Sequence, residues 1–573
     1  MTESLDSREV DLIVIGSGAG GLSAAIVAAD LGLDVLVLEK APHFGGSTAV
    51  SGGVVWVPAN SGMQDQGAGD SADLAMRYLE QVVGPDMRRD LVETYVRTSP
   101  EMVDFFNDRT DVSLVPRMYA PDYQSELEGA SPGGRALDPL VFDGRRLGDW
   151  FSRLRAPYPQ MTIFDGMMVG KADIDHLQQA HRNWASFKHA VAILGRYVRD
   201  RFRYVRGTRL LAGNALAGRL LRSALDAGVR LQSDITVTGL IREDAQVRGV
   251  SVATSSGTVT IRARRGVVLA AGGGGGSARI RAEYVSNADV HRSLAPAESS
   301  GDGFELATGV GGAMVESNIN AVFLAPVSVN RLPDGREVQF PHLILDRQKP
   351  GLIAVNARGK RFVNEADSYH DFVEGMYRDT GDGSSVPAWL IADRPFLRRY
   401  GLGLVRPWPF SERSFLRSGY LVEAPSIAAL AKAIGVPADA LEATVANANE
   451  AARTGVDTEF GRGSTGYNRY LGDATHQPNP CLGPIAKPPF YAVQVWPGDI
   501  GSARGIATDA RARVLDGAGE PIAGLYACGN DMNSVMAGTY PAGGITLGPA
   551  MTFGYIAARD AAGNRTPQKG SDA

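Results

Sequence analysis

Cysteine is scarce in this sequence: its 573 residues include two, Cys481 and Cys528. Two cysteines cannot build a disulfide framework or a zinc site, so we expect reduced thiols in a cytoplasmic protein and no metal centre. Long apolar runs are also missing, because no stretch approaches the ~20 residues that a membrane-spanning helix needs. The acidic N-terminus leads directly into an apolar segment, unlike a signal peptide. We therefore expect a soluble protein that is at most peripheral to a membrane.

The sequence also has no excess of basic residues. Its 58 Lys and Arg residues against 63 Asp and Glu give a formal net charge of -5, whereas a nucleic-acid partner would require a basic face. Glycine, in contrast, is abundant at 69 residues, many of them in short clusters beside strand-like runs. Such clusters are typical of a backbone that repeatedly approaches a large ligand.

The start of the chain predicts one β-α-β unit. Residues 10–16 are a continuous apolar run that stops at glycine, as in a strand buried on both faces. Residues 22–32 are rich in alanine and end at Gly32, which predicts a helix. Residues 34–40 predict the second strand, so a glycine-rich turn lies between the first strand and the helix.

Gly16, Gly18 and Gly21 give that turn the spacing G-x-G-x-x-G. The first glycine permits the tight turn, and the second lets the backbone reach a pyrophosphate. The third permits close helix–strand packing at the positive end of the helix. Glu39 ends the second strand where it would accept both hydroxyls of an adenosine ribose. The pattern predicts a dinucleotide site, with Ala19 and Gly20 completing the turn.

A second glycine-rich loop favours FAD over NAD, because it can run beside the ribityl chain and the flavin ring. The cofactor residues predicted there are Lys40, Gly45, Gly46, Ser47, Thr48, Ser51, Gly52 and Gly53. Three more cofactor positions, from the strand-like runs within 211–240 and 266–277, are Val237, Ala271 and Gly272.

The C-terminus is predicted to close the far side of the flavin. A short strand stops at Gly529, and the last helix opens after a second glycine pair. Amides at that helix N-terminus would stabilise an anionic reduced flavin. The cofactor residues predicted at this end are Gly529, Asn530, Asp531, Gly544, Ile545 and Leu547.

These features predict an α/β fold with two domains. A Rossmann-like FAD-binding domain has a parallel sheet that combines N- and C-terminal segments, and an α+β catalytic cap domain is inserted into it. The expected boundaries are 1–318, with a helical insertion at about 140–212, then 319–494 for the inserted domain and 495–573 for the second FAD-binding segment. Ligands tend to bind in the cleft between such domains.

Two helical patterns lie in the middle of the chain. Residues 71–127 are largely amphipathic. The arginine-rich stretch 182–209 predicts a long helix with Phe187, Val191, Leu194, Val198, Phe202 and Val205 at its apolar positions. We interpret this stretch first as a solvated helix against the cap domain. The alternative is a contact with a membrane surface.

Seven segments resemble the fumarate reductase/succinate dehydrogenase flavoprotein superfamily and, within it, most of all the 3-ketosteroid 1-dehydrogenases. The most diagnostic are TYPAGGITLGPAMTFGY and RFVNEADSY. The others are GSGAGGLSAA, EKAPHFGGSTAVSGGVVWVP, SPGGRALDPLVFDGRRLG, ARTGVDTEFGRG and PFYAVQVWPGDIG. The chain departs from the usual family pattern after PDY, where it reads Gln124-Ser125-Glu126, and after TYP.

The resemblance implies removal of two hydrogens from carbons 1 and 2 of a 3-ketosteroid, as a step in steroid breakdown. It assigns Tyr369 as the base for carbon 2 and Tyr540 with the Gly544 amide as the groups that hold the carbonyl oxygen. Tyr123 would support the base, with Tyr119 as a nearby alternative. The hydride from carbon 1 would go to the flavin N5. No histidine stands in the loop 45–53, so the FAD should be bound non-covalently.

These residue types suit the reaction. Hydrogens beside a carbonyl become acidic when charge on the oxygen is stabilised, and a phenol with an amide forms such an oxyanion hole. Tyrosine, with an ordinary pKa of about 10, acts as a base when neighbouring donors stabilise its phenolate. No second site for NAD(P)H is visible, so the expected electron acceptor is a quinone or a carrier protein.

Three other interpretations stay open. The same residues could activate another ring position or another cyclic ketone, as in a steroid 4-dehydrogenase or a terpenoid desaturase. A fumarate-reductase-like ene-reductase is less favoured, because Tyr540 and Pro541 stand where such enzymes have a basic residue. From a different class, the chain could be a flavin-binding subunit that only relays electrons.

Overall fold

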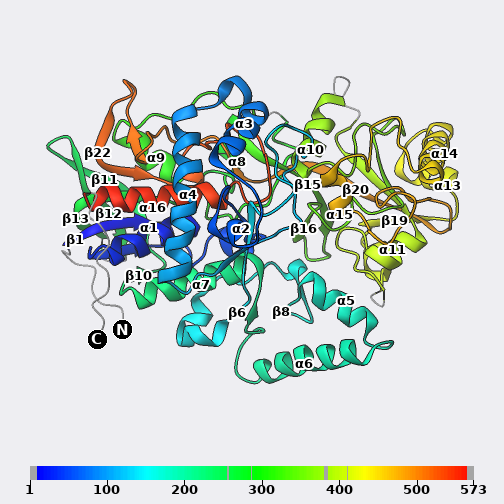
Figure 1. Cartoon of the computed structure of the whole chain (residues 1–573), viewed down its shortest axis with the longest axis horizontal. Coiled ribbons are helices and arrows are strands. Elements are labelled where there is room, and N and C mark those ends of the chain that lie inside the picture. Colours follow the sequence, from blue (N-terminus) through cyan, green and yellow to red (C-terminus); the bar gives the residue numbers. More distant parts are fainter. Residues whose placement is uncertain (1–8, 255–256, 286, 380–384, 409–410, 564–573) are drawn as a thin grey trace.

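Two sheets organise the chain in the computed structural model, which describes residues 9–254, 257–285, 287–379, 385–408 and 411–563 (Figure 1). The first sheet has eight strands, and its main path runs β10-β2-β1-β13-β12-β11, with β22 beside β13 and β21 beside β22. The strands are β1 (Glu9–Ile15), β2 (Val35–Leu38), β10 (Arg230–Gln232), β11 (Thr236–Glu243), β12 (Gln246–Thr254), β13 (Gly257–Leu269), β21 (Arg513–Leu515) and β22 (Pro521–Ala527).

The centre of this sheet is parallel. Ile15 of β1 pairs with Leu38 of β2 and with Leu269 of β13, and Leu269 pairs in turn with Ala527 of β22. Strands from both ends of the chain therefore finish at the same edge, where ligands of open α/β sheets bind. The expected sheet built from N- and C-terminal segments is confirmed.

Helices rich in small residues cover this sheet. The blue α1 (Ala19–Asp30) packs against the red α16 (Leu547–Ala561), which also contacts α4 (Arg89–Arg109) (Figure 1). A Cβ at Gly554 of α16 would lie 2.4 Å from the carbonyl oxygen of Gly20 in α1. The two backbones can approach this closely because glycine stands at the contact. The middle of α16 is thereby held against the beginning of α1, next to the glycine turn after β1.

The second sheet has seven strands and lies on the other side of the molecule (Figure 1). Its order is β16-β15-β20-β18-β17, with β14 and β19 also paired to β20, and only β14 runs parallel to its neighbour among the described pairs. The strands are β14 (Arg292–Ser293), β15 (Val322–Arg331), β16 (Glu337–Pro341), β17 (Leu352–Val355), β18 (Ala388–Asp393), β19 (Leu421–Ala424) and β20 (Phe490–Ser502). Helices α13 (Ile427–Ile434) and α14 (Ala438–Thr454) cover it with an apolar core of their own.

Further strands and helices accompany the two sheets. They are β3 (Val55–Trp56), α2 (Ser61–Asp65), α3 (Ala72–Val83), β4 (Leu114–Pro116), β5 (Ala136–Pro139), β6 (Phe142–Asp143), β7 (Thr162–Ile163), β8 (Met167–Met168), β9 (Arg209–Leu210), α7 (Ala212–Asp226), α8 (Ala278–Tyr284), α9 (Asp302–Gly309), α10 (Tyr369–Arg378), α11 (Arg394–Tyr400), α12 (Arg413–Arg417) and α15 (Gly466–Leu471). The helical pattern expected over 71–127 ends earlier, because β4 and a loop follow α4.

The helix expected over 182–209 is shorter than predicted. Helix α6 (Trp184–Arg201) follows α5 (Lys171–Gln179), and the pair projects below the rest of the molecule in Figure 1. The buried Asp200 carboxylate accepts hydrogen bonds from the Thr208 amide at 3.0 Å and hydroxyl at 2.7 Å, which turns the chain back toward β9. None of the helices in the described ranges is long and apolar enough to cross a membrane.

Candidate active site

The glycine turn after β1 has the geometry that the motif predicts. Gly16 has φ +102°, and an added Cβ would lie 2.1 Å from the carbonyl oxygen of Ala270. A Cβ at Gly21 would lie 2.1 Å from the Gly16 oxygen. At Gly18, by contrast, the single described atom within 4 Å of an added Cβ would be Thr48 Oγ1, at 3.7 Å. Gly16 and Gly21 thus permit close packing of the backbone, whereas Gly18 leaves the backbone accessible to a ligand.

The predicted ribose acid is fixed by the same turn. The Glu39 carboxylate accepts hydrogen bonds from the Ser17 amide at 3.0 Å, the Ser17 hydroxyl at 2.5 Å and the Ala41 amide at 2.9 Å. The Ile235 amide donates to the Glu39 carbonyl at 3.0 Å, so β11 begins beside Glu39. The predicted cofactor residue Val237 is buried near the start of this strand. Glu39 is therefore oriented before a ribose binds.

The second glycine-rich loop lies against the first. Thr48 Oγ1 accepts a hydrogen bond from the Ala19 amide at 2.9 Å, which satisfies the first amide of α1. The Gly45 amide donates to the Ser17 hydroxyl at 3.0 Å. A Cβ at Gly53 would lie 2.4 Å from the Ala212 carbonyl carbon. The remaining residues of this predicted set lie in the same loop: Lys40, Gly46, Ser47, Ser51 and Gly52.

A buried carboxylate joins the ends of β13 and β22. Asp531 accepts hydrogen bonds from the Ala271 amide at 2.5 Å and the Gly273 amide at 2.8 Å. Burial raises the pKa of Asp531 to about 6, although both amides favour the ionised form. Gly272 lies between these two amides, and Gly529 and Asn530 precede Asp531 at the end of β22. The predicted residues from the middle and the end of the chain therefore meet at one edge of the sheet.

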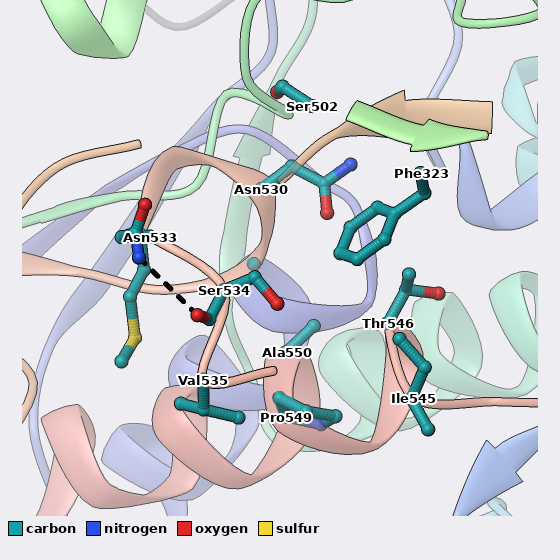
Figure 2. Close-up of a pocket in the computed structure, with 12 residues that line it drawn as sticks. Phe323, Ser502, Asn530, Asn533, Ser534, Val535, Ile545, Thr546, Pro549 and Ala550 are labelled. Atoms are coloured by element: carbon teal, nitrogen blue, oxygen red, sulfur yellow. Dashed lines mark hydrogen bonds between the residues drawn. The ribbon is translucent and has the colours of Figure 1, made fainter. Parts of the chain in front are cut away.

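A cavity opens at the N-terminus of α16 (Figure 2). Its lining combines β15, β20, the loop after β22 and the start of α16, and includes Phe323, Ser502, Asn530, Ser534, Ile545 and Thr546. Sequence reasoning missed Phe323, Ser502 and Ser534, because no glycine spacing or chain neighbour marks them. The open backbone at Gly18, the oriented Glu39 and this cavity fit the elongated FAD that the sequence predicts.

Three of the predicted tyrosines meet beside that cavity. The ring centroids of Tyr369 and Tyr540 lie 5.1 Å apart, and the Tyr123 ring lies 5.8 Å from each of them. The Phe323 ring, which lines the cavity, is 5.6 Å from the Tyr540 ring. Tyr119 is not part of this tyrosine cluster, because its side chain is 85% exposed. Of the two candidates in the segment 119–123, only Tyr123 joins the other tyrosines.

Backbone contacts hold the cluster together. The amide of Tyr123 and the hydroxyl of Tyr78 both donate to the Pro541 carbonyl, at 2.9 and 2.6 Å. Gly544, with φ +104°, accepts a hydrogen bond from the Trp56 amide at 3.1 Å. The Gly544 amide itself donates to no residue in the part of the chain that the structure describes. It is thus free to meet a ligand oxygen beside Tyr540.

Burial dominates the electrostatics of the cluster. It raises the pKa of Tyr369 well above the usual value, and interactions with the Tyr123 and Tyr540 hydroxyls raise it further. Burial also raises the pKa of Tyr540, while hydrogen bonds from Tyr369 and Thr546 lower it. Tyr369 is the first residue of α10, where the helix dipole favours negative charge.

Two further residues of the cluster were missed by sequence reasoning. The Tyr467 ring lies 4.6 Å from the Tyr123 ring, and the His370 ring lies 5.9 Å from the Tyr540 ring. His370 Nδ1 accepts a hydrogen bond from the Leu324 amide at 3.2 Å. Its position directly after Tyr369 was a usable signal for His370, whereas Tyr467 is brought in by packing between distant segments.

Comparison with known proteins covers nearly the whole chain. Residues 11–547 match the family described as FAD binding domain, which identifies the cofactor as FAD. A 4-oxocyclohex-2-ene-1-carboxylate 5-dehydrogenase of Sinomonas cyclohexanicum is 40% identical, over 96% of this chain and 93% of its own. A 3-oxosteroid 1-dehydrogenase of Mycolicibacterium smegmatis is 37% identical, over 97% of this chain and 98% of its own.

A solved structure agrees in fold over the same length. The crystal structure of 3-ketosteroid delta1-dehydrogenase from Sterolibacterium denitrificans in complex with 1,4-androstadiene-3,17-dione superposes with a TM-score of 0.89 at 38% identity. The superposition covers 98% of this chain and all (100%) of that chain.

Proposed function

This chain belongs to the 3-ketosteroid 1-dehydrogenase family of FAD-binding oxidoreductases, and we propose that it introduces a double bond between carbons 1 and 2 of a 3-ketosteroid. One observation carries the proposal: Tyr369, Tyr540 and Tyr123 come from distant parts of the chain and meet beside the cavity at the start of α16. A buried cluster of phenols suits a flat apolar ketone.

In the proposed reaction, Tyr540 and Gly544 hold the carbonyl oxygen of the substrate. The Tyr540 hydroxyl and the free Gly544 amide donate to it, and both groups lie in the loop before α16, where the Trp56 amide donates to the Gly544 carbonyl. As charge develops on that oxygen, these donors stabilise it, and so acidify the hydrogens on carbon 2. An oxyanion hole of this kind typically contributes about 3 kcal/mol or more to lowering the barrier.

Tyr369 takes the proton from carbon 2 as a phenolate. Burial opposes its ionisation, so the negative charge must be shared with the Tyr123 hydroxyl and favoured by the N-terminus of α10. Bound FAD supplies the oxidation by accepting the hydride from carbon 1. The same burial excludes water, which protects a developing carbanion from reprotonation.

The FAD is proposed to be bound non-covalently by the residues of the β1–α1 turn, Glu39, the loop 45–53 and the start of α16. The absence of histidine from the sequence 45–53 supports this proposal. Denaturing the purified protein should release all of its flavin into the supernatant. Flavin that stays with the precipitated chain would contradict non-covalent binding.

The reaction is tested by incubating the FAD-loaded protein with saturated and 4-ene 3-ketosteroids and an artificial electron acceptor. We expect a new carbon 1–carbon 2 double bond in both products, read by mass and nuclear magnetic resonance spectra. Absence of product from every 3-ketosteroid would contradict the proposal. A double bond at carbons 4 and 5 alone would move the chemistry to another ring position.

A second candidate function is dehydrogenation of a smaller cyclic ketone. It is favoured by the relative at 40% identity, which is named for a 4-oxocyclohex-2-ene-1-carboxylate. The tyrosine cluster would activate the α-carbon of such a ketone in the same way. Comparing kcat/KM for 4-oxocyclohexane carboxylates and 3-ketosteroids decides between the two candidates.

The electron acceptor is proposed to be a quinone or a carrier protein. Helix α6 is proposed to contact a membrane surface. Trp184, Phe187, Val191 and Val198 share one face of α6 and are 68%, 44%, 52% and 56% exposed. Basic residues flank this face, as in helices that lie on anionic lipid, and Lys188 Nζ lies 5.4 Å from the Trp184 ring. An apolar substrate or a quinone would then arrive from the bilayer.

Vesicle sedimentation tests this contact. Replacing Trp184 and Phe187 together by serine should abolish binding to anionic vesicles. The control is Val456→Ser, which removes a 60% exposed apolar side chain elsewhere. Equal sedimentation of the double variant and the control would contradict the contact.

A further inference from the structure

The segment 124–126, where the chain departs from the usual family pattern, forms hydrogen bonds to two helices. Gln124 Nε2 donates to the Asp371 carboxylate of α10 at 3.0 Å. The Tyr467 amide of α15 donates to the Ser125 hydroxyl at 3.1 Å. The residues that set this chain apart from the family pattern therefore connect the loop after Tyr123 to α10 and α15.

The hydrogen bond of Gln124 lies close to two tyrosines of the cluster. Gln124 directly follows Tyr123, and Asp371 lies two positions after Tyr369. The Tyr123 and Tyr369 rings stand at 79° to each other, with 5.8 Å between their centroids. A single hydrogen bond thus joins the two backbone segments that carry these rings.

Both ends of this hydrogen bond are anchored. The Gln124 amide donates to the Tyr78 hydroxyl at 3.3 Å. On α10, the Ser368 hydroxyl accepts a hydrogen bond from the Asp371 amide at 3.1 Å and donates to the Asp371 carboxylate at 2.9 Å. Asp371 therefore belongs to the cap at the start of α10, in the same turn as Tyr369.

Apolar packing places the two segments against different cores. Phe372, Val373 and Met376 of α10 belong to the core of the second sheet, whereas Tyr123 packs against the core of the first sheet. Apolar contacts are not directional, but a hydrogen bond has a preferred length and angle. The bond from Gln124 to Asp371 can therefore set the position of the start of α10 relative to the Tyr123 loop more closely than packing does.

We propose that Gln124 is a positioning residue, whose hydrogen bond to Asp371 holds the base Tyr369 at its distance from the supporting Tyr123. The proposal rests on the proposed function. A displacement of about 1 Å at a reacting group can slow a reaction by about 10²-fold. The packing of both segments remains when this bond is lost, so the expected displacement and the loss of rate are smaller.

The first variant is Gln124→Glu, which keeps the size of the side chain but turns its donor amide into a carboxylate that faces Asp371. We expect kcat and the rate of flavin reduction by the substrate to fall about tenfold, the effect of losing a hydrogen bond to a charged group, with KM changed by about twofold or less. Flavin content and the unfolding transition should match wild type, because Gln124 is exposed.

The second variant combines Gln124→Glu with Asp371→Asn, which exchanges the carboxylate and the amide without a change in size. The amide at position 371 then donates to the carboxylate at position 124, and the Ser368 hydroxyl, which can accept as well as donate, tolerates the exchange. We expect kcat to return to within about threefold of wild type, as coupled residues do in a double-mutant cycle.

The matched control is Gln160→Glu. It removes a hydrogen bond from Gln160 Nε2 to the carbonyl of Gln339 in β16, which is 2.8 Å long and also reaches the second sheet. This variant should keep the kcat of wild type. Equal slowing by Gln160→Glu would show a general loosening between the sheets and overturn the positioning role.

The other outcomes separate the positioning role from the reaction itself. If Gln124→Glu matches wild type in kcat and flavin reduction, the positioning role is wrong and the proposed function stands. A slow Gln124→Glu that the exchange does not restore, or a loss confined to KM or flavin content, would also overturn it. Absence of turnover by the wild-type protein on every cyclic ketone would overturn both.

Discussion

The cofactor cradle and the tyrosine cluster are built by different means. The cradle, formed by the turn 16–21 and the loop 45–53, depends on backbone shape: a Cβ at Gly16 or Gly21 would lie 2.1 Å from a carbonyl oxygen. The tyrosine cluster depends on side chains from the loop at Tyr123, the start of α10 and the loop before α16. The cradle is thus sensitive to added atoms, and the cluster to removed hydroxyls.

The largest effect is expected at Gly16. Gly16→Ala places a Cβ in a left-handed conformation and against the Ala270 carbonyl, so the turn must open. We expect the free energy of unfolding to fall by about 3 kcal/mol or more and FAD to be lost, which abolishes activity. Chemical denaturation and flavin absorbance measure the two effects.

Gly18→Ala is the matched control for this change. Its Cβ would meet a single described atom, Thr48 Oγ1 at 3.7 Å. The FAD-free protein should therefore keep its stability to within about 1 kcal/mol, while FAD affinity falls because the methyl group faces the ligand. Equal loss of stability in the two variants would contradict this interpretation. It would show that both positions require glycine because of steric contacts within the chain, and not because a ligand must reach the backbone at Gly18.

The next largest effect is expected at Tyr369. Tyr369→Phe removes the proposed base and should lower kcat by about 10³-fold, within the range that general bases contribute. Flavin content and the unfolding transition should stay as in wild type, because the ring is kept. Unchanged turnover would instead support a subunit that only relays electrons. Rapid-mixing measurement of flavin reduction by the substrate separates these outcomes.

The contrast also explains what the sequence could predict. Glycine spacing and the acid at the end of β2 are local patterns, so Gly16, Gly18 and Glu39 were found from the residues alone. Resemblance supplied Tyr369 and Tyr540, since no spacing links residues so far apart in the chain. Packing alone brings in Tyr467, and a sequence without its fold contains no sign of that contact.

Boundaries were predicted less sharply than elements. Residues 182–209 read as one helix, but the Asp200 carboxylate turns the chain after Arg201, and a helical pattern cannot show that bond. The proposed boundary at 494 and 495 lies within β20, which runs continuously from Phe490 to Ser502 and passes from the second sheet to the cavity. Because β20 belongs to the second sheet and also lines the cavity, the composition does not change at its middle, and the sequence gives no sign of where the boundary should lie.

A graded effect is expected from pH. The proposed base works as a phenolate, and burial raises the pKa of Tyr369, so at neutral pH most molecules carry the proton. Raising the pH increases the ionised fraction, and kcat/KM should therefore rise up to about tenfold per pH unit below that pKa. Rates measured from about pH 6 to about pH 10 give the slope. A flat profile in the wild type would contradict a tyrosine base.

The smallest effect is expected at Tyr119, and it sharpens the comparison within one segment. Tyr119 and Tyr123 lie four positions apart, yet Tyr119 is 85% exposed while Tyr123 packs against Tyr369 and Tyr540. Tyr119→Phe should leave kcat, KM and stability unchanged, because its hydroxyl remains in water in either state. Tyr123→Phe should lower kcat by about tenfold, because the Tyr369 phenolate would lose the hydroxyl that donates to it and shares its negative charge. If Tyr119→Phe were the slower variant, the segment would have to move on substrate binding, and the support for the base would pass from Tyr123 to Tyr119.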